Sequence, residues 1–147
     1  MKLDFYSAVV FIHVVSAVIS IGPLFILMPV IKRLRGVQSD VELAYMSVIK
    51  VTIRIVMHAG HVLVCSGALL IITGPWSWHT SWVVMTIIVL AISGFFLATG
   101  FTRVLRTFNI PGINKNELLD RLNRTSWLYI GLMLVMLWLM VQKPNFW

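Results

Sequence analysis

The sequence predicts an all-α integral membrane protein, in which four helices form an antiparallel bundle with both chain termini outside. The first observation is composition: 59% of the 147 residues are hydrophobic and the mean hydropathy is +0.93, whereas soluble domains are about half apolar or less. The second is a set of four apolar runs, each near the roughly 20 helical residues that cross a hydrocarbon layer about 30 Å thick. The third is the placement of the basic residues, which gather in alternate connections.

The four runs form one transmembrane domain over residues 1–147. They are approximately Tyr6–Ile31, Val51–Gly74, Trp82–Thr102 and Ser126–Val141. Gly22 and Pro23 predict a bend in the first run, because proline removes one backbone hydrogen bond and crowds the preceding turn. On the third run, Ala91, Gly94 and Ala98 form a ridge of small residues that lets helices approach, either within the bundle or between copies in a homo-oligomer.

The three connections differ in character. Residues 36–44 are short and polar, whereas the second connection carries three tryptophans in seven residues, which is typical of a membrane–water interface. In the third connection, Asn109-Ile110-Pro111-Gly112 predicts a turn. The stretch Asn114–Leu122 follows, and we expect it to be a short amphipathic helix that is capped by Asn114 or Asn116 and rests on the bilayer surface or on the bundle.

The distribution of charge predicts the orientation. Ten of the twelve basic residues flank the first and third connections, and the second connection, Pro75–Ser81, has none. The ten are Lys32, Arg33, Arg35, Lys50, Arg54, Arg103, Arg106, Lys115, Arg121 and Arg124. The positive-inside rule therefore places the first and third connections in the cytoplasm and both termini outside. Because orientation accounts for these charges, the net charge of +7 gives no reason to expect a nucleic-acid partner.

Three histidines, His13, His58 and His61, lie inside the apolar runs. An ionisable side chain at membrane depth usually faces the protein interior and serves a function, and imidazole is the commonest metal and haem-iron ligand. The helical rise places His13 and His61 about 9 Å apart along the membrane normal before tilt. His58 and His61 share one helix face, so they cannot be opposing ligands of one haem. We therefore expect haem b with His13 and His61 as axial candidates, His58 nearby, and electron transfer with a quinone or a larger membrane redox complex.

Other interpretations of these residues stay open. Arg54 lies one turn inward of His58, where it either binds a haem propionate or another anion, or sets the orientation. The fourth run carries thioethers at helical spacing that either ligate copper or haem or simply pack: Met133, Met136 and Met140. A second hypothesis is therefore a copper- or metal-handling protein that uses His58, His61 and these methionines. A third is a non-catalytic accessory subunit whose histidines hydrogen-bond across helices.

No catalytic constellation accompanies the histidines. No carboxylate lies in any span, there is no Ser/His/Asp set or phosphate loop, and the single Cys65 excludes an intramolecular disulfide. The sequence leaves open whether the chain is an enzyme.

Nearly the whole chain carries a pattern found in small four-helix bacterial membrane proteins. Its pieces are Phe11–Ala17 with Ile21–Phe25, Arg54 ahead of Ser66–Leu70, Trp82, and Asn123-Arg124 ahead of Val141–Pro144. On these residues the chain resembles the HemJ-type protoporphyrinogen oxidases and the CopD-like copper-resistance membrane domains. The resemblance implies a protein of the bacterial cytoplasmic membrane with a haem b site at His13. HemJ-type proteins carry a lysine early in the third helix, and Trp82–Thr86 contains none, which implies a relative with a different ligand set.

Overall fold

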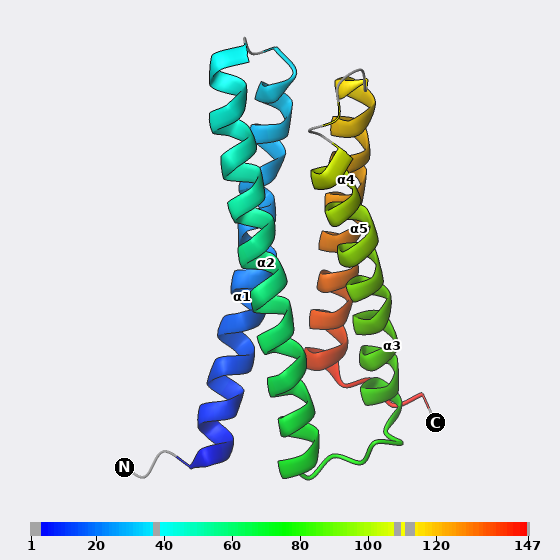
Figure 1. Cartoon of the computed structure of the whole chain (residues 1–147). Coiled ribbons are helices and arrows are strands. Elements are labelled where there is room, and N and C mark those ends of the chain that lie inside the picture. Colours follow the sequence, from blue (N-terminus) through cyan, green and yellow to red (C-terminus); the bar gives the residue numbers. More distant parts are fainter. Residues whose placement is uncertain (1–3, 37–38, 108–109, 111–113, 147) are drawn as a thin grey trace.

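The computed structural model describes residues 4–36, 39–107, 110 and 114–146, and the regular structure in these ranges is helical. The elements are α1 (Phe5–Leu34), α2 (Ser39–Thr73), α3 (Ser81–Phe96), the π-helical turn η1 (Leu97–Phe101), α4 (Thr102–Thr107) and α5 (Lys115–Gln142). Four helical segments are long and apolar enough to cross a membrane, with α3 and η1 counted as one. The predicted all-α class and the four membrane-length helices are confirmed. In Figure 1 these helices lie side by side, and the beginning of α1 and the end of α5 lie at the end where α2 connects to α3.

The helix α2 extends beyond its apolar run. It begins at Ser39 rather than at Val51. Met46 and Ile49 are 5% and 0% exposed and belong to the main core cluster, so packing against other helices stabilises turns that lie outside the apolar run. Residues 39–44, which the sequence assigns to the first connection, are therefore helical.

The helix α5 joins two segments that the sequence separates. The amphipathic stretch over 114–122 forms the first turns of α5 rather than a helix of its own. Its leucines are buried in the bundle, which favours one continuous helix: Leu118, Leu119 and Leu122. Asn114 is the cap, and its side chain accepts a hydrogen bond from the backbone N–H of Asn116 at 3.2 Å. The turn predicted over 109–112 lies outside the described residues, apart from Ile110.

The helices pack as two pairs. α1 packs along α2, α3 packs on α5, and contacts between α1 and α5 join the pairs. α1 continues through Pro23 as a single helix. A buried hydrogen bond crosses between the pairs, because Ser20 Oγ of α1 lies 2.9 Å from Tyr129 Oη of α5. Over their described residues α2 and α3 do not pack closely on each other, and we call the boundary between them the α2–α3 seam.

The turn η1 lies against α5. A Cβ atom at Gly100 would lie 2.5 Å from Cγ2 of Thr125, so this approach depends on the absence of a side chain. The next residue, Phe101, is fully buried and meets the ring of Tyr129 edge to face at a centroid distance of 6.3 Å. The π-helical turn therefore lies at a close contact between the third span and the fourth.

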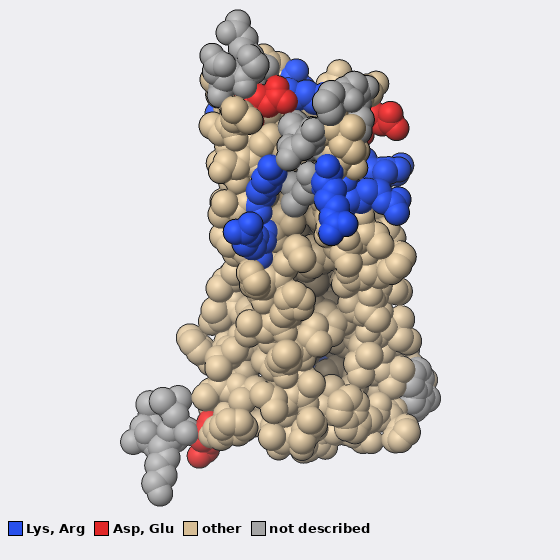
Figure 2. Space-filling model, in the orientation of Figure 1, with Lys and Arg blue, Asp and Glu red and all other residues tan. Residues whose placement is uncertain are grey.

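Charged side chains gather at one end of the molecule. Figure 2 shows lysines and arginines around the end where α1 connects to α2, while most of the remaining face is uncharged. Among the described residues, two ion pairs join segments at the charged end: Arg35 pairs with Asp120, and Lys115 Nζ lies 2.6 Å from Glu42 Oε2. The same view shows the surface hollowed near its middle, below the basic residues and along the α2–α3 seam.

Candidate functional site

The imidazole of His13 is buried and held by a hydrogen bond to the next helix. Its side chain on α1 is 9% exposed, and Nδ1 lies 3.0 Å from Oγ of Ser66 on α2. The Ser66 hydroxyl has one proton, which it directs at the backbone carbonyls of Val62, at 2.7 Å, and Leu63, at 3.1 Å. The Ser66 oxygen is therefore the acceptor, and Nδ1 of His13 donates. In that tautomer Nε2 carries a free lone pair, which is the form of histidine that ligates metals.

A glycine on α2 makes room for the His13 ring. A Cβ atom at Gly67 would lie 3.1 Å from Cε1 and 3.6 Å from Nδ1 of His13. Contacts as short as 3.1 Å are tighter than carbon atoms normally make. Ser66 and Gly67 thus act together, since one residue binds the imidazole and the next leaves space beside it.

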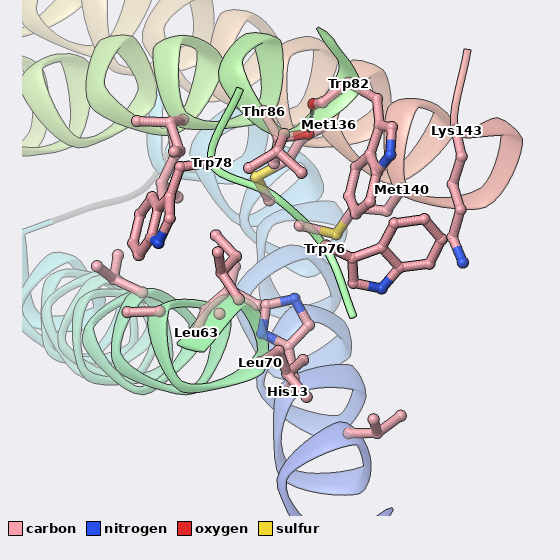
Figure 3. Close-up of a pocket in the computed structure, with 18 of the residues that line it drawn as sticks. His13, Leu63, Leu70, Trp76, Trp78, Trp82, Thr86, Met136, Met140 and Lys143 are labelled. Atoms are coloured by element: carbon pink, nitrogen blue, oxygen red, sulfur yellow. Dashed lines mark hydrogen bonds between the residues drawn. The ribbon is translucent and has the colours of Figure 1, made fainter. Parts of the chain in front are cut away.

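The His13 ring faces a cavity of about 430 Å³ between the two helix pairs. Its walls come from α1, α2, α3, α5 and the second connection, and they are mostly apolar. Figure 3 shows the imidazole directed toward Trp76 and Met140, with Trp82 and Met136 beyond them. Trp76 and Trp82 meet edge to face with ring centroids 5.2 Å apart. The volume and the aromatic walls are typical of a small-molecule site.

One cation lies at the rim of this cavity. Lys143 follows the end of α5 in a left-handed conformation, with φ of 46°. Its Nζ lies 4.4 Å from the ring centroid of Trp76 and 5.9 Å from that of Trp82, so cation–π attraction holds it there. Lys143 is the only lysine or arginine among the described residues that line the cavity. Lys143 belongs to none of the sites predicted from the sequence, although its place directly after the last span, on the side of the tryptophan-rich connection, is a usable signal.

A second, smaller cavity of about 130 Å³ continues along the α2–α3 seam. His61 and Gly60 line it from α2, and Tyr129 lines it from α5. The ridge residues Gly94 and Ala98 also face it, so they border a gap beside α2. Both cavities share three lining residues and are therefore neighbours: Leu63, Val64 and Leu90.

The structure separates the residues that the sequence groups into one site. His13 lines the larger cavity, whereas His61 lines the smaller one and its side chain is exposed. His58 is also exposed and meets His61 edge to face, with ring centroids 6.3 Å apart. Arg54 is exposed and lines neither cavity. Within the described part of the chain, no group of three His, Cys, Asp or Glu residues is placed to hold a metal ion.

The methionines of the fourth span divide between the two cavities. Met136 and Met140 line the larger cavity with His13, and Met133 lines the smaller one with His61. Met133 and Met136 are 1% and 2% exposed. The spacing of the three therefore serves packing, and it also brings two thioethers to the cavity that holds the buried histidine.

No protein-family model, curated protein or solved structure matches the chain.

Proposed function

We propose that this chain is a haem-b-binding membrane protein, in which the larger cavity would hold the haem and His13 would be an iron ligand. The observation that carries the proposal is the hydrogen bond from Nδ1 of His13 to Ser66, because it fixes the ring and leaves the Nε2 lone pair for iron. Haem b, when bound, supplies one-electron redox chemistry. The function is then electron transfer in the membrane, with a quinone or a larger redox complex as partner.

The residues around the cavity fit such a group. Aromatic and thioether walls suit a flat apolar macrocycle. Lys143, at the rim, carries the positive charge that a propionate needs, and it replaces Arg54 in that role because Arg54 lines neither cavity. Met136 and Met140 share the cavity with His13, so a thioether is a better candidate than His61 for a second iron ligand.

The proposed orientation places both termini and the tryptophan-rich connection outside a bacterial cytoplasmic membrane. The gathering of exposed basic side chains where α1 connects to α2 supports it. The cavity then lies in the outer half of the membrane, with Lys143 near the outer surface.

The visible spectrum of the detergent-purified protein tests the proposal. We expect a Soret band and a reduced α-band in the native chain and their loss in His13→Gly, with added imidazole restoring part of the signal in the vacated space. His58→Leu is the matched control, because His58 is exposed on α2 and the spectrum should not change. A native protein that is colourless and also fails to bind haem added in detergent contradicts the proposal.

A second candidate is copper(I) handling at the same cavity. It is supported by one observation, that His13, Met136 and Met140 line a common space, since thioethers favour copper(I) and imidazole also binds copper. The Met136→Leu, Met140→Leu double variant separates the two candidates. Copper(I) binding should be lost in that variant, whereas a haem ligated by His13 should be retained with a changed spectrum.

A further inference from the structure

Four polar residues form a stripe on the outer face of α2, which we call the α2 polar stripe: Arg54, His58, His61 and Cys65. Spacings of four, three and four residues keep them on one side of the helix, and all four side chains are exposed. Apolar side chains on the same helix are exposed beside them, such as Val62 and Leu69 at 45% and 42%. A single copy therefore presents two imidazoles on the apolar surface of a helix long enough to span a membrane.

One copy of the chain does not satisfy these two imidazoles. Their rings meet edge to face, but neither ring forms a hydrogen bond to any residue that the structure describes. Ionisable side chains within membrane spans almost always face protein or a water-filled cavity. His61 borders the smaller cavity, and His58 lines neither of the two cavities. His58 therefore needs a covering partner, and the exposed side of His61 lies beside it on the same stripe.

We propose that two copies of this chain pair through the α2 polar stripe. All copies insert with one orientation, so a two-fold axis along the membrane normal brings each residue of the stripe to the depth of its counterpart. A neutral imidazole offers one donor and one acceptor nitrogen. His58 and His61 of two copies can therefore hydrogen-bond across the interface. Any other protein would need matching groups at the same two depths, whereas a second copy carries them by necessity.

The native cysteine provides a direct test. Cys65 is the only cysteine of the chain, is exposed, and lies one turn outward of His61 on the stripe. Oxidation of membranes that contain the native chain with copper phenanthroline should give a reducible species at twice the 16.7 kDa mass of one copy, absent in Cys65→Ser. The matched control carries Ile92→Cys together with Cys65→Ser. Ile92 is 42% exposed on α3 at a similar expected depth, and we expect no linked species from it.

Histidine variants connect the cross-link to the proposed contacts. His58→Leu combined with His61→Leu should lower the rate of Cys65 linkage about fivefold or more, which is the effect of losing an interhelical hydrogen bond. His61→Asn should retain the linkage, because an amide also donates and accepts. The pairing is overturned if Ile92→Cys links as fast as Cys65. It is also overturned if Cys65 reacts with a permeant maleimide yet forms no disulfide, or links only to a different protein.

Discussion

Ser66→Ala tests whether one hydroxyl orients the His13 ring, and Ser93→Ala is its matched control. Ser66 and Ser93 are both buried, at 4% and 2% exposed, and each donates to the backbone carbonyl four residues earlier at 2.7 Å. Only Ser66 also accepts from an imidazole on another helix. The two substitutions therefore differ by one interhelical hydrogen bond.

The expected difference in the free energy of unfolding follows from the usual strength of one interhelical hydrogen bond. Interhelical hydrogen bonds in membrane proteins contribute about 0.6 to 1.7 kcal/mol, so Ser66→Ala should lower the free energy of unfolding by about that much more than Ser93→Ala does. Loss of the group that orients a ligating histidine weakens metal binding by about 10- to 100-fold. We expect the affinity for haem to fall by that factor in Ser66→Ala, and to be unchanged in Ser93→Ala.

Two measurements on the same preparations check these values. Reversible unfolding in mixed micelles, followed by circular dichroism, gives the free energies of unfolding without haem. A titration followed by absorbance gives the affinity for haem. If Ser66→Ala and Ser93→Ala lose equal free energy and bind haem equally well, Ser66 neither holds the ring nor fixes the tautomer of His13.

Three further predictions concern the bundle. Gly100→Ala should lower the free energy of unfolding by about 1 to 3 kcal/mol, because its Cβ would meet Cγ2 of Thr125 at 2.5 Å. Adding Thr125→Ser, which removes Cγ2, should recover part of the lost free energy of unfolding in the same micelle assay. If nothing is recovered, the contact with Cγ2 is not the cause of the loss. Tyr129→Phe should cost about 0.6 to 1.7 kcal/mol, because it leaves the buried Ser20 hydroxyl without its interhelical partner; an unchanged stability would contradict a bond at that site. Alkaline phosphatase fused at the carboxyl terminus should be active and the same enzyme fused after Gly36 inactive, and the reverse pattern would invert the proposed orientation.

The number of membrane-length helices could be predicted from the sequence because length and hydropathy decide whether a helix can cross a membrane. The ends of the helices could not be predicted, because they depend on packing between helices outside the apolar runs. Leu118 and Leu122 at the start of α5 are buried by other helices, and no local signal in the amphipathic stretch reveals that its helix continues into the last span. In the same way, the start of α2 follows from the burial of Met46.

The site could be predicted in part. Its central residue, His13, follows from the expense of placing an imidazole at membrane depth. The residue that His13 contacts could not be predicted in this way. Helical rise gives the depth of a side chain, but packing decides in which direction around the helix axis the side chain points. His61 was expected beside His13, yet it faces a different cavity. The residue in contact is Ser66, which the sequence shows only as a small residue within the second apolar run.

The α2–α3 seam also affects how a ligand reaches the larger cavity. Because α2 and α3, which both line the larger cavity, are long and apolar enough to cross a membrane, we expect the cavity to exchange ligands with the lipid phase. Occupancy then follows the partition coefficient of the ligand and the amount of lipid per protein, since the bilayer acts as a reservoir. An apolar compound that is scarce in solution can saturate such a cavity, and dilution with empty lipid, at constant aqueous volume, should release it.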